Sequence, residues 1–167
     1  MSHEAMFGRD PMKARGYEDL VKAVYQLWRF FSHCRRGYTG RRVAEDAVGV
    51  VLTLDNWLVM AETLRKKVLD EAVKLANEKD PEIIDEDRRP IAFVAVPDLE
   101  QTLSEATSAT FKQALLAANS DKYAGWRLYD ILRELVGKDA REVRAYPYAK
   151  DIGTLLPWWD ETDALGA

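Results

Sequence analysis

Two pairs of arginines flank a short glycine-containing segment, CRRGYTGRR at residues 34–42. The planar guanidinium group of arginine matches two phosphate oxygens at once, and glycine lets a loop approach another chain closely. The pairs are Arg35-Arg36 and Arg41-Arg42. Between them, Tyr38 offers a ring on which a base can stack, and Thr39 offers a hydroxyl that can donate to a phosphate. The segment therefore predicts contact with a nucleic-acid backbone.

The same arginines allow a second interpretation. The whole chain carries a net charge of −4, so its carboxylates can bond the arginines, or the arginines can cap helix ends. Other basic residues bear on the first interpretation. Arg29, one or two helical turns before the segment, extends the basic patch, and so do Arg65, Lys66 and Lys67 if the helices pack side by side. Arg88-Arg89 is a third arginine pair.

Charge is unevenly distributed along the chain. Residues 1–42 contain nine Lys or Arg against four Asp or Glu, a net charge of +5, whereas residues 43–167 contain 15 against 24, a net charge of −9. Such asymmetry is typical of a nucleic-acid contact or of complementary surfaces for self-assembly. It also arises from solvated charges that have no role.

The residue types that usually support catalysis are scarce. His33 and Cys34 are adjacent, and adjacent side chains on a helix point about 100° apart, so they do not form a nucleophile pair. The sequence has no glycine-rich phosphate loop, no H-E-x-x-H and no G-x-S-x-G. The acids at 85–87 are interpreted as a solvated loop rather than a magnesium site. We therefore expect no catalytic residue, no metal site, no cofactor and no enzymatic activity; a small enzyme of unrecognised type is the least favoured interpretation.

The C-terminal segment contains a tryptophan pair, Trp158-Trp159, after Pro157 and before Asp160 and Glu161. An aromatic pair on an acidic segment suits docking into a partner's groove. The same tryptophans can instead fold back onto the domain's own core. The sequence leaves both interpretations open.

Helical spacing dominates the first half of the chain. Apolar residues between Tyr17 and Cys34 recur at steps of one, three and four, which predicts a helix that Gly37 and Gly40 end. The same spacing continues without proline from 41 to 80. We divide that stretch at Asp55 into helices at 41–53 and 55–78, because Asp and Asn favour helix starts.

The second half is expected to hold the minor β element. Residues 91–96, IAFVAV, are rich in β-branched types and lie between two prolines, which predicts a strand, with a further short strand at 83–84. Asp98 is expected to cap a helix that runs to about Asn119. A further helix at 121–136 is closed by Gly137, and a short last helix begins near Asp139 and ends at Pro147.

Composition and length indicate one domain of mainly α class. The chain has 167 residues, of which 47% are hydrophobic and 31% charged, and is long enough to bury a core. We expect about five to six helices and a minor β element near 83–96. The domain comprises an irregular lead at 1–16, a helical body at 17–146 with a loop and strand insertion at 79–97, and an irregular acidic, aromatic tail at 147–167.

The expected location is the cytoplasm. No apolar run approaches the roughly 18–20 residues that a membrane span needs, and the first residues lack the pattern of a secretory signal. Cys34 is the only cysteine, which excludes an intrachain disulfide and favours a reducing compartment. We therefore expect no membrane contact.

Three stretches carry a resemblance to a known family: DLVKAVYQLWRFF, RRVAEDAVGVVLTLDNWLVMAETL and IAFVAVPDLEQTLSEATSATFKQALLAANSDKYAGWRLYDIL. Across roughly residues 19–132 the layout resembles the small-subunit family of archaeal type I-A CRISPR effector complexes, which act in antiviral defence. The resemblance implies a non-enzymatic, mainly helical subunit that lines an RNA-guided ribonucleoprotein complex, packs against other subunits and copies of itself, and helps hold guide RNA or target DNA. None of the stretches is a signature motif, and no binding residue is transferred.

Two functions from different classes follow. The first is a nucleic-acid-associated assembly subunit that contacts an RNA or DNA backbone through the arginine-rich segment. The alternative is a helical protein–protein adaptor or regulator whose tail docks a partner and which touches no nucleic acid.

Overall fold

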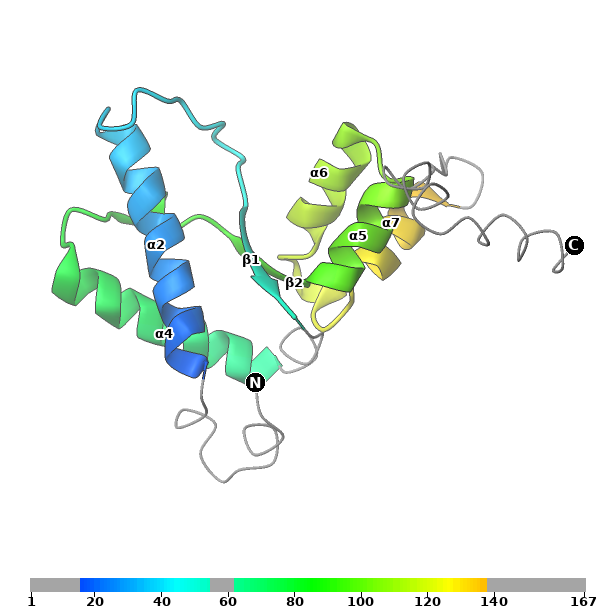
Figure 1. Cartoon of the computed structure of the whole chain (residues 1–167), viewed down its shortest axis with the longest axis horizontal. Coiled ribbons are helices and arrows are strands. Elements are labelled where there is room, and N and C mark those ends of the chain that lie inside the picture. The colour runs from blue at the N-terminus through cyan, green and yellow to red at the C-terminus, as the bar shows by residue number, and fades with distance from the viewer. Residues whose placement is uncertain (1–15, 55–61, 138–167) are drawn as a thin grey trace, which may run out of the picture.

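The computed structural model describes residues 16–54 and 62–137 (Figure 1). In these ranges the chain forms five α-helices and one small parallel sheet, so the predicted class, mainly α with a minor β element, is confirmed. The elements in chain order are α2 (Tyr17–Arg35), β1 (Gly49–Thr53), α4 (Glu62–Lys79), η2 (Asp85–Asp87), β2 (Ile91–Ala95), α5 (Val96–Glu105), α6 (Ser108–Ala117), η3 (Asp121–Tyr123) and α7 (Leu128–Val136).

Helix α2 confirms the helix predicted from the first apolar stripe. Its buried side includes Val21, Val24, Trp28 and Phe31. Acidic residues occupy its first turn and basic residues its last turn, which complements the helix dipole. The chain leaves the helix through Gly37, whose φ of 80° lies in the left-handed region that favours glycine.

The helix predicted at 41–53 is wrong, because residues 49–53 form strand β1. β1 pairs in parallel with β2, with Gly49 opposite Ile91 and Thr53 opposite Ala95. Val50 and Val51 are β-branched and suit a strand. The sequence allows either a helix or a strand here, and pairing with β2 favours the strand. β2 confirms the predicted strand at 91–96. Ile83-Ile84, predicted as a short strand, instead precedes the 3₁₀ turn η2.

Helix α4 connects the two parallel strands. It begins at Glu62, so the predicted helix at 55–78 is confirmed from that residue on, and residues 55–61 lie outside the described ranges. Its buried residues recur at steps of four: Leu64, Val68, Ala72 and Ala76. α4 thereby packs against α2 over a continuous stripe.

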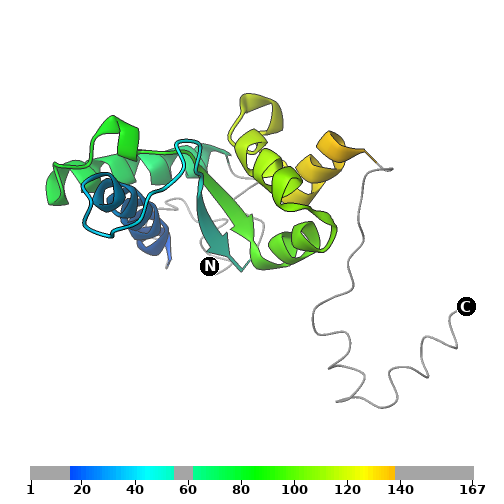
Figure 2. The ribbon, with the colours of Figure 1, turned by 90° about the horizontal axis from the view of Figure 1, so that it is seen from above.

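The sheet separates two apolar cores. Ile91 and Phe93 of β2 belong to the core formed with α2 and α4, whereas Ala92 and Val94 belong to the core formed with α6 and α7. Alternate residues of a strand face opposite sides, so one five-residue strand serves both cores. Figure 2 shows the strands between the two groups of helices. At the start of β1, Gly49 makes room for two side chains, since an added Cβ would collide with Ile91 Cδ1 of β2 and lie 3.1 Å from Leu27 Cδ1 of α2.

The helix predicted to run from Asp98 to about Asn119 is two helices, α5 and α6. The chain breaks at Ala106, and Thr107 begins α6: its hydroxyl accepts from the Thr110 N–H at 3.2 Å, while Thr110 Oγ1 accepts from the Thr107 N–H at 2.9 Å. This reciprocal pair is a capping box. The helix predicted at 121–136 is likewise divided into η3 and α7. It ends at Gly137 as predicted.

Asp98 caps a helix other than the expected one. Its buried carboxylate accepts from the N–H of Leu128 at 2.8 Å and of Tyr129 at 3.1 Å, both in the first turn of α7. Arg127 Nε lies 3.6 Å from the same carboxylate. The carboxylate thus satisfies two free donors at the start of α7 and ties α7 to α5.

No helix in the described part of the chain combines the length and the apolar character required to cross a membrane. The short helix predicted from Asp139, the lead and the tail lie outside the described residues.

Candidate nucleic-acid interface

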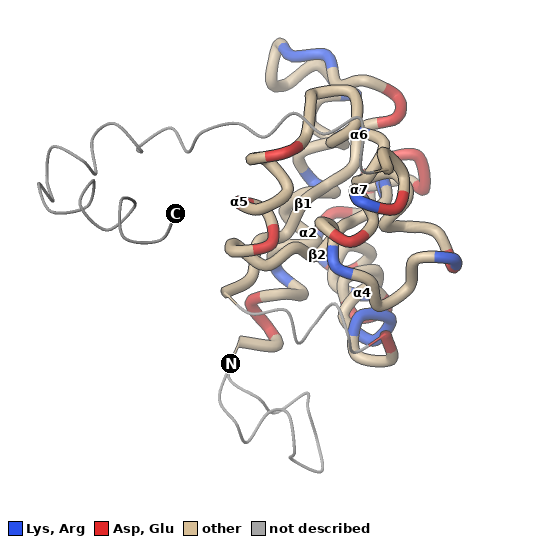
Figure 3. Tube along the Cα trace, turned by 90° about the vertical axis from the view of Figure 1, so that its right-hand side faces the viewer, with Lys and Arg blue, Asp and Glu red and all other residues tan. Residues whose placement is uncertain are grey.

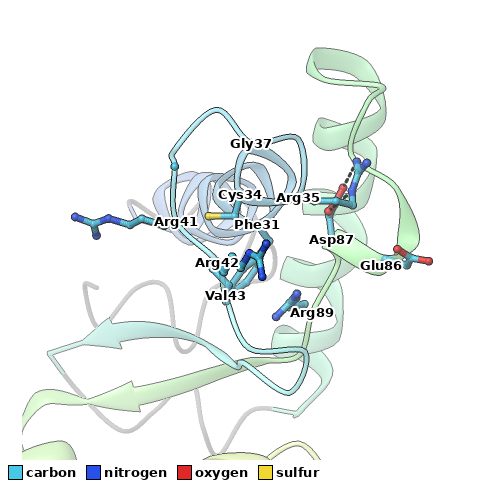
Figure 4. Close-up of a pocket in the computed structure, with 11 residues that line it drawn as sticks. Phe31, Cys34, Arg35, Gly37, Arg41, Arg42, Val43, Glu86, Asp87 and Arg89 are labelled. Atoms are coloured by element: carbon cyan, nitrogen blue, oxygen red, sulfur yellow. Dashed lines mark hydrogen bonds and ion pairs between the residues drawn. The ribbon is translucent and has the colours of Figure 1, made fainter.

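A pocket of about 530 Å³ lies where the arginine-rich segment leaves α2 (Figure 4). The end of α2, the following loop and the residues around η2 line it: Phe31, Cys34, Arg35, Gly37, Gly40, Arg41, Arg42, Val43, Glu86, Asp87 and Arg89. Three of the four arginines of the CRRGYTGRR segment are among the lining residues, together with Arg89 from the distant 88–89 pair.

Arg35 is neutralised within the chain. Its Nε and Nη2 donate to the two oxygens of Asp87 at 2.9 and 2.8 Å, and Nη2 also donates to the carbonyl of Glu82 at 3.0 Å. This is the bidentate geometry of a strong charge-assisted pair. For Arg35 the alternative interpretation is confirmed: the arginine bonds a carboxylate of its own chain.

Asp87 is buried, so the prediction that the acids at 85–87 form a solvated loop is wrong for this residue. Burial by itself raises the pKa of the Asp87 carboxyl, but hydrogen bonds from Arg35 and from the Ile84 N–H, together with the Arg35 charge, outweigh it and hold the pKa below its ordinary value. Asp87 therefore stays charged at neutral pH. The sequence does not distinguish Asp87 from the neighbouring acids, because only the fold shows which of the three is buried.

Arg36 and Arg29 also lie against carboxylates. The Arg36 side chain is only 14% exposed and pairs with Glu82 and with Asp80, the latter at 3.6 Å. Arg29 Nε lies 3.7 Å from the same Asp80 carboxylate. These arginines hold the end of α2 to the segment that follows α4, so they are poorly placed to bind a further anion.

Arg41 and Arg42 differ from the first pair. Both are exposed, and neither has an ion pair among the residues that the structure describes. Figure 4 shows Arg41 pointing away from the pocket, whereas Arg42 lies between the end of α2 and Arg89. Two guanidinium groups therefore share one side of the pocket.

Arg89 is held in place by its surroundings. Its guanidinium carbon lies 5.0 Å from the centre of the Phe31 ring, and Nη1 donates to the Ala44 carbonyl. Its backbone carbonyl accepts from Trp28 Nε1 at 3.0 Å. In the described part of the chain Arg89 makes no ion pair, whereas its neighbour Arg88 is bonded to Asp85 at 2.9 Å. The sequence indicated a third arginine pair, but only the fold shows which member reaches the pocket.

Tyr38 and Thr39 have different surroundings. The Tyr38 side chain is exposed and lies beside His33, with ring centres 5.6 Å apart, and beside the Arg36 guanidinium, 4.8 Å from the ring centre. The Thr39 hydroxyl donates to Cys34 Sγ at 3.3 Å and accepts from the Arg41 N–H at 3.2 Å. Thr39 thus orders the loop, while Tyr38 presents an aromatic surface next to the pocket.

The basic residues of α4 are not brought into the pocket. Arg65 lines a separate small recess with Ala92 and Trp126, Lys66 pairs with Glu62 at 2.7 Å, and Lys67 is exposed. Figure 3 shows basic and acidic positions interspersed along the described trace. The candidate interface is therefore local. The predicted docking residues Trp158 and Trp159 lie outside the described residues.

No protein-family model, curated protein or solved structure matches the chain. The resemblance of layout to CRISPR small subunits therefore stays a prediction.

Proposed function

We propose that this chain binds the phosphate backbone of a nucleic acid through Arg41, Arg42 and Arg89, as a non-enzymatic subunit of a cytoplasmic nucleoprotein assembly. The observation that carries the proposal is the presence of Arg42 and Arg89 on one side of a pocket, without an ion pair to any carboxylate in the described ranges.

Electrostatics favour an anion at this position. Two cations that share a pocket repel each other, and the repulsion is relieved when an anion lies between them. On the opposite wall of the pocket, Arg35 is not free to bind the anion, because it is already bonded to Asp87. Glu86 also lines the pocket, but Figure 4 shows its carboxylate pointing outward, away from Arg42. A phosphate group suits the two guanidinium groups in charge and geometry.

Features beside the pocket favour a polymer over a single small anion. Arg41 points outward and can reach a second phosphate, and the exposed Tyr38 ring can stack on a base of a single strand. None of these groups reads the edge of a base, so binding is expected to depend little on sequence.

Membership of an RNA-guided effector complex is a narrower proposal. It rests on the resemblance across residues 19–132, and the pocket supports only its nucleic-acid part. If no nucleic acid binds, the protein–protein adaptor becomes the better account.

Salt dependence of binding tests the proposal. With three phosphate contacts, the affinity of the full chain for a single-stranded oligonucleotide should fall with a log–log salt slope of about −2, at roughly 0.7 per contact. Replacing Arg41 and Arg42 together by Ala should flatten the slope to about −0.7, as measured by fluorescence anisotropy.

The control removes two positive charges elsewhere: Lys22 near the start of α2 and Arg133 on α7, both replaced by Ala. The slope should then stay near the wild-type value. Equal losses in the two double variants would show that net charge alone drives binding, and an undiminished slope in the Arg41/Arg42 variant would refute the proposed site.

A further inference from the structure

Strand β1 has an outer edge that no residue of the described ranges covers. The sheet has two strands in the order β1-β2, and the backbone groups of β1 alternate between those that face β2 and those that face away. The Gly49 N–H donates to the Pro90 carbonyl at 2.9 Å, which fixes this alternation. Residues 49, 51 and 53 therefore bond to β2, and the N–H and C=O groups of Val50 and Leu52 point outward. In the described ranges these outward groups have no hydrogen-bond partner.

The sequence of this edge carries neither of the residue types that often protect an edge strand, charged residues and proline. The seven residues Val48 to Leu54, VGVVLTL, include no charge and no proline. Leu52 is 52% exposed and Leu54 81% exposed. By strand alternation Leu52 lies on the same face as Val50, which packs with Val48 against the core of α6 and α7. Leu54 follows directly after the strand, in a bend. A row of apolar side chains thus begins in a core and continues into solvent.

We propose that β1 pairs with β1 of a second copy, antiparallel and about a twofold axis at Val51, to form a four-stranded sheet across the dimer. In this register Val50 lies opposite the Leu52 of the other copy. The two residues exchange both of their backbone hydrogen bonds, so the pairing forms four in all.

The edge is self-complementary in this register. On one face Val50 lies opposite Leu52 of the other copy. Extending the pairing by one residue beyond each end of β1 also brings Val48 opposite Leu54, which buries both exposed leucines against apolar neighbours. On the other face Val51 lies opposite Val51 of the other copy, and Gly49 lies opposite Thr53 of the other copy, so no charged residue lies between the two strands. A foreign strand would need a matching uncharged sequence, which a second copy already has.

Oligomeric state tests the proposal with the full-length chain. Sedimentation velocity over a range of concentrations should show a monomer–dimer equilibrium. Leu52→Lys should raise the dimer Kd about tenfold or more, because two lysines would lose hydration at the seam. Leu103→Lys is the matched control, since Leu103 is similarly exposed, at 48%, but lies on α5. It should leave the dimer unchanged. Circular dichroism should report the same helix content for both variants.

Hydrogen exchange separates strand pairing from other contacts. The amides of Val50 and Leu52 should exchange slowly in the dimer and rapidly after Leu52→Lys. A monomer at all concentrations would overturn the proposal. If the amides of Val50 and Leu52 are nevertheless protected in that monomer, a segment of the same chain covers the edge. A dimer that Leu52→Lys leaves intact would also overturn it.

Discussion

At the scale of single residues, burial decides which charges are structural. In the Arg35–Asp87 pair the Asp87 side chain is 3% exposed and the Arg35 side chain 37% exposed, and the pair joins the end of α2 to η2. Replacing Asp87 by Asn keeps the shape and removes the charge. We expect a loss of about 1–2 kcal/mol in the free energy of unfolding, since hydrogen bonds to charged groups contribute somewhat more than neutral ones but partial exposure weakens the pair.

The pH dependence of this effect follows from the lowered pKa of Asp87. A carboxyl with a lowered folded-state pKa contributes its full stability above the unfolded-state pKa of about 3.9, and loses it as the pH falls through the folded-state value. Wild type and Asp87→Asn should therefore differ in urea denaturation at neutral pH and converge in acid. Asp85→Asn, on a carboxylate that is 95% exposed, should change little. A constant difference down to low pH would show that packing, not charge, matters.

The arginines also show how far sequence reasoning reaches at this scale. The CRRGYTGRR segment pointed to a loop that lines a pocket in the fold, with three of its arginines among the lining residues. It could not separate the paired Arg35 and Arg36 from the exposed Arg41 and Arg42, because their carboxylate partners lie on a segment far along the chain. Arg89 was missed as a pocket residue for the same reason.

At the scale of elements, the contact between Asp98 and α7 should be a major tie in the second core. Asp98→Ala leaves the N–H groups of Leu128 and Tyr129 buried without an acceptor, so we expect about 1–3 kcal/mol of destabilisation. Asp98→Asn keeps one acceptor oxygen and should lose less. Chemical denaturation checks both variants. An Ala variant as stable as wild type would show that solvent or another group replaces the cap.

Helices with one strong apolar stripe were predictable, as α2 shows. The segment at 41–53 was not, because its apolar residues fit helical spacing while its β-branched residues favour a strand, and pairing with the distant β2 decides the outcome. The break between α5 and α6 had a local signal in Thr107 and Thr110, whose side chains cap reciprocally. The sequence predicts that Asp98 caps its own helix, whereas in the fold it caps α7.

At the scale of the whole molecule, a net charge of −4 argues against a protein that coats nucleic acid over a broad surface. Basic and acidic residues are interspersed along the described trace, so within the described ranges a basic interface relies on the cations that have no ion pair (Figure 3). Charge composition suggested two oppositely charged parts of the chain. Within one chain, the fold brings acidic residues of the segment 80–87 against the basic end of α2.

The most direct test of the central claim follows the arginine side chains themselves. In an NMR titration of the full chain with a single-stranded oligonucleotide, the Nε–Hε resonances of Arg42 and Arg89 should shift most and that of Arg41 next. Those of Arg35 and Arg36 should stay in place, because their guanidinium groups are already bonded to carboxylates. A shift confined to Arg65, or no arginine shift at saturating oligonucleotide, would contradict the account.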